Sequence, residues 1–139
     1  MNLGPSKMET SSVRILVVED FEPFRTLVRA ILEKNPRLHI IAEVTDGLDA
    51  VQKAAGLKPD LILLDIGLPM LNGLDAARLI RKLAPDSKIL FVSQEPSIEV
   101  VDDVRTLGAS GYVVKTRLGS DLLTAVEAVL LGRDFFGGK

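Results

Sequence analysis

The sequence predicts an α/β fold in which helices cover both faces of a parallel sheet. Short runs rich in Val, Ile and Leu alternate along the chain with segments whose apolar residues recur at helical spacing. The apolar runs contain almost no polar residues, which is typical of strands that are buried on both faces. Strict alternation of strands and helices implies right-handed crossovers and therefore a parallel sheet.

The first half of the chain contains three strand patterns and two helix patterns. The first helix pattern carries apolar residues at helical spacing from Phe24 to Leu32 and ends at Asn35-Pro36. Asp46-Gly47 forms the turn into the second helix, which ends near Gly56. The expected elements are strands over 13–19, 38–44 and 60–65, and helices over 23–34 and 47–56.

The second half repeats the pattern with three helices and two strands. A loop with Pro69 leads into the third helix, which Pro85 ends, and Pro96-Ser97 opens the fourth helix. Gly108 closes that helix as its C-terminal cap. The expected elements are helices over 73–83, 96–108 and 119–132, and strands over 87–93 and 111–114.

Composition limits the classes of protein that fit. A chain of 139 residues with 47% hydrophobic residues is expected to form one globular domain. The net charge of −2 argues against nucleic-acid binding by this domain itself. The absence of cysteine excludes disulfides and thiolate metal sites. Neither a transmembrane span nor a secretory signal is visible, so we expect a cytoplasmic location.

Both ends of the chain differ from the middle. Residues 1–12 are polar and aperiodic, so we expect a flexible leader before a domain that covers residues 13–132. Residues 133–139 are expected to form a C-terminal tail or the start of a linker. The Phe135-Phe136 pair within them could pack at a partner face, mark the linker or form a packed end.

Several apolar strands end on polar residues. The first ends at Glu19-Asp20, the third at Asp65, the fourth at Ser93, and Lys115 follows the fifth. The carboxyl ends of parallel strands share one edge of the sheet, where α/β folds bind ligands. Clustered carboxylates repel one another unless a cation joins them, so this arrangement predicts a metal site.

Four segments in this order, VVED, LILLDIGLPMLNG, ILFVSQ and LGASGYVVK, are similar to the receiver domain of two-component response regulators. The resemblance spans residues 13 to about 132, and the C-terminal helix resembles the LuxR/NarL-type branch. It implies a flavodoxin-like (βα)5 three-layer sandwich whose five parallel strands have the order 2-1-3-4-5.

The resemblance also implies a role for each strand-end residue. Asp65 would be the phosphoacceptor, with Ser93 and Lys115 contacting the phosphoryl group. Asp20, Glu19, Asp65 and the backbone carbonyl of Gly67 would hold Mg²⁺. Ser93 and Tyr112 would form the switch.

The implied function is phosphorylation-dependent signalling rather than enzymatic turnover of a substrate. A sensor histidine kinase or a phosphotransfer protein would supply the phosphoryl group. The output would be transcription regulation through a DNA-binding domain outside this chain, and a homodimer is compatible with the helix faces. The alternative is a stand-alone or phosphorylation-independent receiver that acts as a protein-interaction module.

Two departures from the family pattern bear on these expectations. Thr116 stands where many receivers have proline, which leaves the Lys115–Thr116 peptide open between cis and trans. Gly67 offers no side chain to shield a phosphoryl group, which leaves its lifetime open. A flavin binder of the same fold is disfavoured because the loop after the first strand, EDFEPF, lacks a phosphate-cradling Gly/Ser/Thr run. A phosphatase with an aspartate nucleophile is disfavoured because such an enzyme would need a second catalytic acid two residues after Asp65, where this chain has Gly67.

Other polar residues and glycines have structural interpretations. His39 lies within an expected strand without a second histidine, so it is expected to be structural. Asp46 and Asp60 are interpreted as cap and turn residues. Gly73 and Gly108 are expected to serve backbone geometry.

Overall fold

The computed structural model describes residues 12–94 and 98–136. Most of the predicted leader, the Pro96-Ser97 opening of the fourth helix and residues 137–139 lie outside the described residues. The observed elements are β1 (Val13–Val18), α2 (Glu22–Leu32), β2 (Leu38–Val44), α3 (Gly47–Leu57), β3 (Leu61–Asp65), α4 (Gly73–Leu83), β4 (Lys88–Ser93), α5 (Ile98–Thr106), β5 (Gly111–Val114), the 3₁₀ turn η1 (Lys115–Arg117), α6 (Leu118–Leu130) and β6 (Phe135–Phe136).

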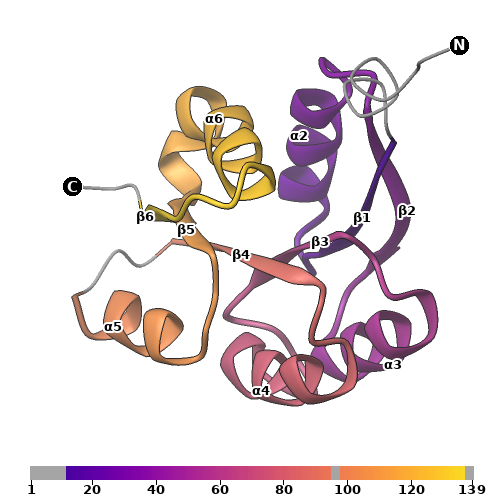
Figure 1. Ribbon diagram of the computed structural model, residues 1–139, viewed down its shortest axis with the longest axis vertical. Coiled ribbons are helices and arrows are strands. Elements are labelled where there is room, and N and C mark those ends of the chain that lie inside the picture. The colour runs from indigo at the N-terminus through magenta and orange to yellow at the C-terminus, as the bar shows by residue number, and fades with distance from the viewer. Residues whose placement is uncertain (1–11, 95–97, 137–139) are drawn as a thin grey trace, which may run out of the picture.

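The predicted three-layer α/β architecture is confirmed. Figure 1 shows α2 and α6 on one face of the sheet and α3, α4 and α5 on the other. Successive strand residues alternate between two apolar cores, as the period of a pleated strand requires. In β1, for example, Ile15 and Val17 pack under α2 and α6, whereas Leu16 and Val18 pack under the other three helices.

The sheet has six strands in the described part of the chain, so the predicted five-stranded order is a strand short. The order is β2-β1-β3-β4-β5-β6, and every pairing is parallel. Gly111 pairs with Phe135 and Tyr112 pairs with Phe136. A two-residue strand is too short to show a periodic pattern, which is why the sequence does not predict β6.

The absence of a side chain at Gly111 allows β6 to approach. A Cβ at this position would lie 2.4 Å from the carbonyl oxygen of Phe135 and 2.8 Å from Cδ1 of Leu90. The two phenylalanines continue the pleat, since Phe135 packs against the core under α2 and α6 and Phe136 against the opposite core. The guanidinium of Arg105 in α5 stacks 3.9 Å from the Phe136 ring centroid. The predicted end of the domain at residue 132 stays a prediction.

The helix signals in the sequence act as predicted where the structure describes them. Asp46 caps α3 by accepting a hydrogen bond from the Asp49 amide at 2.8 Å. Asp60, at the bend before β3, accepts a hydrogen bond from the Arg14 amide of β1 at 2.8 Å, so its side chain contacts the neighbouring strand rather than capping a helix. Gly108 has a φ of +83°, as its place after α5 requires. Within the described residues, no helix is both long and apolar enough to cross a membrane.

Candidate functional site

The strand-end residues of the sequence prediction meet in one pocket at the carboxyl edge of the sheet. The pocket has a volume of about 440 Å³. Glu19 and Asp20 follow β1, Asp65 and Ser93 are the last residues of β3 and β4, and Lys115 begins η1. Aromatic and loop residues complete the lining, namely Phe21, Phe24, Ile66, Gly67, Gln94 and Val100.

Strand register explains why these residues meet. Asp65 pairs with Val92, and Ser93 pairs with Val114. Ser93 is therefore one step beyond the partner of Asp65, and Lys115 is one step beyond the partner of Ser93. Parallel strands in this register bring residues far apart in sequence to the same edge.

The pocket buries most of its charged groups. Glu19, Asp65 and Lys115 are each less than 10% exposed, whereas Asp20 faces solvent. The ammonium of Lys115 lies 2.7 Å from Oε1 of Glu19 and 3.3 Å from Oδ2 of Asp65. The same nitrogen lies 4.4 Å from the ring centroid of Phe24. One buried cation is thus held between two carboxylates and an aromatic face.

Burial raises the pKa of the Glu19 carboxyl above its ordinary value. The hydrogen bond with Lys115 and that with the Phe21 amide oppose this shift, and the nearby Asp65 charge adds to it. The Phe21 amide donates to Oε2 of Glu19 at 3.0 Å. Both carboxylate oxygens of Glu19 therefore have partners.

The acidic residues have the chemistry of a divalent cation site. Glu19, Asp20 and Asp65 each offer an oxygen, and these oxygens lie within 4.8 Å of one another. A donor set made only of carboxylate oxygens, with solvent access at Asp20, fits a hard cation such as Mg²⁺ that keeps several waters. The Gly67 amide donates to Oδ1 of Asp65 at 3.3 Å, so Gly67 borders the same set.

The loop after β3 returns directly beneath the site. The Gly73 amide donates to the Ile66 carbonyl at 2.7 Å. A Cβ at Gly73 would lie 2.1 Å from the carbonyl oxygen of Asp65. The glycine predicted to serve backbone geometry therefore sets how closely α4 approaches the central acid. Above the site, a Cβ at Gly67 would meet no atom within 4 Å.

Neither the predicted switch residue Tyr112 nor His39 lines the pocket. Tyr112 is fully buried in the core under α3, α4 and α5. His39 is exposed in β2 and borders a separate groove beside α2. The Lys115–Thr116 peptide, which the sequence leaves open, is trans, since no described residue has a cis peptide bond.

Sequence reasoning missed two residues of α2 that support the site. The sequence indicates Phe24 only as part of the apolar face of its helix, yet its ring lies against Lys115. Arg25 donates from Nη1 to the main-chain carbonyl of Glu19 at 3.0 Å. Their positions four and five residues after Asp20, one helical turn on, are the only sequence signal that could have indicated them.

A parallel flavodoxin-like sheet with an acidic pocket at its carboxyl edge defines a class of signalling domain, and comparison with known proteins identifies the family. The profile described as "Response regulator receiver domain" matches residues 15–127. The chain therefore belongs to the receiver-domain family of two-component response regulators.

Individual relatives agree with this assignment. The chain is 33% identical over 133 residues to the transcriptional regulatory protein DegU of Brevibacillus brevis, covering 96% of the chain and 56% of that protein. It is 38% identical over 114 residues to a protein-glutamate methylesterase/protein-glutamine glutaminase of Thermotoga maritima, covering 81% of the chain and 33% of that protein. The chain thus spans about half, or less, of the length of these curated relatives.

Solved structures of the LuxR/NarL type share the fold. A LuxR-family response regulator from Aurantimonas sp. SI85-9A1 is 31% identical and superposes with a TM-score of 0.85 over 90% of this chain and 89% of that one. The receiver domain of the response regulator NarL from Mycobacterium tuberculosis is 26% identical, with a TM-score of 0.83 over 88% of this chain and 99% of that one. The predicted resemblance to the LuxR/NarL branch is confirmed.

Proposed function

We propose that this receiver domain accepts a phosphoryl group on Asp65, with Mg²⁺ in the adjacent acidic cluster, and that the modification switches an output. One observation carries the proposal. Three carboxylates, a hydroxyl and a buried ammonium from four different strand ends line one pocket. An aspartate nucleophile needs a cation beside it, because its own charge opposes attack on an anionic phosphoryl group.

The metal ligands would be Asp20, Glu19, Asp65 and the backbone carbonyl of Gly67. When bound, Mg²⁺ would offset the negative charge of the incoming phosphoryl group. Asp20 is the exposed member of the set and is open to a hydrated ion, whereas Glu19 is held by Lys115 and the Phe21 amide.

The remaining residues would act on the phosphoryl group itself. A carboxylate oxygen of Asp65 attacks phosphorus, an O–P bond forms, and the bond between phosphorus and the donor's leaving atom breaks. Lys115, 3.3 Å from Oδ2 of Asp65, would pair with a phosphoryl oxygen as a point charge. The Ser93 hydroxyl would donate to another oxygen, and Tyr112 would respond through β4 and β5, since Phe91 pairs with Tyr112.

The family supports a proposal for the partners and the output. A sensor histidine kinase or a phosphotransfer protein would supply the phosphoryl group. One relative, DegU, is a transcriptional regulatory protein, so regulation of transcription is the proposed output, through a DNA-binding domain other than this one. A homodimer and a cytoplasmic location stay predictions.

Mass spectrometry of the intact protein tests the proposal. After incubation with Mg²⁺ and acetyl phosphate, the wild type should gain one phosphoryl group, and Asp65→Asn should gain none. Asp60→Asn is the matched control, because Asp60 directly precedes the first residue of β3, whereas Asp65 is its last residue. Labelling that survives in Asp65→Asn, or its absence in the wild type, would contradict the proposal.

The alternative is a receiver that works as a protein-interaction module without phosphorylation. Gly67 has no side chain to shield a phosphoryl group at Asp65, and a Cβ there would meet no atom within 4 Å, which is the observation in its favour. Partner binding that is unchanged by Asp65→Asn would support this alternative.

A further inference from the structure

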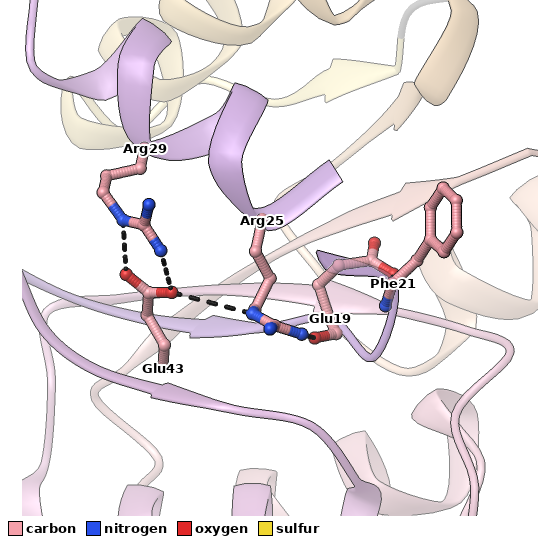
Figure 2. A network of polar contacts seen from close by, with 5 residues as sticks. All are labelled: Glu19, Phe21, Arg25, Arg29 and Glu43. Atoms are coloured by element: carbon pink, nitrogen blue, oxygen red, sulfur yellow. Dashed lines mark hydrogen bonds and ion pairs between the residues drawn. The ribbon is translucent and has the colours of Figure 1, made fainter. Parts of the chain in front are cut away.

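A polar network outside the pocket holds the turn that carries Glu19 and Asp20 (Figure 2). Glu43, on the edge strand β2, accepts hydrogen bonds from Nε and Nη2 of Arg29 at 2.9 and 2.8 Å. Its Oε1 also lies 3.8 Å from Nε of Arg25. Arg25 in turn donates from Nη1 to the main-chain carbonyl of Glu19 at 3.0 Å. The network thus runs from β2 through α2 to the first acid.

The hydrogen bond from Arg25 is accepted by the main-chain carbonyl between the two acids, Glu19 and Asp20. The Glu19 carbonyl belongs to the planar peptide group that joins Glu19 to Asp20, so the bond from Arg25 orients the peptide group between the two acids. The Glu19 amide is also bound, since it donates to the Val44 carbonyl at 3.0 Å. The amide and the carbonyl of Glu19 are therefore both hydrogen-bonded, the first to the Val44 main chain and the second to the Arg25 side chain.

The Arg25 side chain is itself well held. It is only 19% exposed, and the Glu43 carboxylate beside it is 25% exposed. Arg29 occupies both oxygens of Glu43 in a two-pronged contact, which fixes the carboxylate that Arg25 faces. In these contacts Arg25 touches none of the three carboxylate side chains of the pocket, so its effect on the geometry of the site passes through the Glu19 main chain.

We propose that Arg25 is a positioning residue for the divalent cation site, anchoring the Glu19–Asp20 peptide while Glu43 holds the guanidinium. This inference rests on the proposed function, because it takes Mg²⁺ as the ion at Glu19, Asp20 and Asp65. Partners of this kind, one step outside the ligands, commonly change metal affinity by 10- to 100-fold when they are removed.

The direction in which Mg²⁺ affinity changes when Arg25 is replaced distinguishes a positioning role from a purely electrostatic one. Arg25 is a cation beside a cation site, so its charge alone would weaken Mg²⁺ binding. Removing that charge without any loss of geometry would make Mg²⁺ bind more tightly. A positioning residue predicts the opposite, that Mg²⁺ binds more weakly.

Calorimetric titration with Mg²⁺ at fixed ionic strength tests the proposal on the wild type, Arg25→Met and Arg78→Met. Arg78 is the matched control, since it pairs with Asp75 on α4 and its side chain is 54% exposed. We expect Arg25→Met to raise the Kd for Mg²⁺ about tenfold and Arg78→Met to leave it within about twofold. Saturating Mg²⁺ should restore phosphoryl labelling of Arg25→Met.

Arg25→Lys keeps the charge but cannot contact Glu43 and the Glu19 carbonyl with one planar group. With the charge held constant, its Kd should still exceed that of the wild type, and it decides the question if Arg25→Met does not fold. Unchanged or tighter binding in the folded variants overturns the proposal and leaves the phosphoacceptor role intact. A wild type that binds no Mg²⁺ overturns both.

Discussion

The ammonium of Lys115 lies 2.7 Å from a carboxylate oxygen of Glu19, and both side chains are buried. It also lies 3.3 Å from Asp65, so one lysine offsets the charge of two acids. A divalent cation in the cluster would face the same carboxylates. We therefore expect a bound metal ion to replace part of the stabilisation that Lys115 provides.

Replacing this lysine tests that expectation. Lys115→Met should lower the free energy of unfolding in EDTA by up to about 3 kcal/mol, because two carboxylates lose their buried partner. Added Mg²⁺ should then stabilise the variant more than the wild type, as measured by urea unfolding. Lys53→Met, on the exposed side of α3, is the control. An equal Mg²⁺ effect on both proteins would contradict the expectation.

The Glu43 carboxylate predicts a pH-dependent contribution to stability. Its hydrogen bond with Arg29 lowers its pKa below the ordinary value of 4.5. A carboxylate whose pKa is lower in the folded than in the unfolded protein stabilises the fold at pH values above its unfolded-state pKa. This stabilisation is lost as the pH falls through the pKa of the folded state. Glu43→Gln should therefore be less stable than the wild type at neutral pH, by about 1 kcal/mol or less because the pair is partly exposed.

The difference between the wild type and Glu43→Gln should shrink as the pH falls below 4.5. Urea unfolding at a series of pH values measures it, with Glu127→Gln, on the exposed side of α6, as the matched substitution. A Glu43→Gln difference that stays constant through the acid range would show that the Arg29 contact does not lower the pKa.

Gly73 is expected to tolerate no side chain. A Cβ there would lie 2.1 Å from the Asp65 carbonyl oxygen, so Gly73→Ala must push α4 away from β3. We expect a loss of about 1–3 kcal/mol in thermal or urea unfolding. Gly56→Ala, in α3 with no atom within 4 Å of the added Cβ, should instead gain up to about 1 kcal/mol. Similar effects of the two substitutions would refute the steric explanation.

Met70 adopts a left-handed backbone conformation without the residue type that favours it. Its φ is 68°, and it is 74% exposed in the loop before α4. Met70→Gly should raise the free energy of unfolding by about 0.5–1 kcal/mol, because glycine has no Cβ to clash. Met70→Leu should have little effect in the same unfolding experiment. A gain with leucine and none with glycine would argue against backbone strain.

The contact between Arg105 and Phe136 joins α5 to β6. A double-mutant cycle with Arg105→Gln and Phe136→Leu should give a coupling of about 0.5–1 kcal/mol, as expected for a guanidinium on an aromatic face. Urea unfolding of the four proteins measures it. Additive effects would mean that the stacked geometry contributes nothing to stability.

The fold and the central site could be predicted because the signals are local. Each β-strand that reaches the site is a mainly apolar run, and each run ends on or beside the polar residue that enters the pocket. Since all parallel strands end at one edge, Asp65, Ser93 and Lys115 could be brought together without any knowledge of long-range contacts.

The parts that could not be predicted depend on contacts between distant segments. Arg25 and Glu43 are 18 positions apart, and no local pattern links an arginine on a helix to an acid on the next strand. The strand at Phe135–Phe136 forms only because Gly111 leaves room for it. Tyr112 could be placed in a strand, but its depth in the core follows from packing by three helices.

The short strand β6 has a practical consequence for anyone joining this domain to a reporter. The family profile ends at residue 127, and the sheet ends at Phe136. A fusion made at residue 132 would leave Gly111 and Tyr112 without their neighbouring strand. Unpaired N–H and C=O groups would then be open to strands of other molecules, which invites self-association. A fusion made after Phe136 keeps Gly111 and Tyr112 paired with β6.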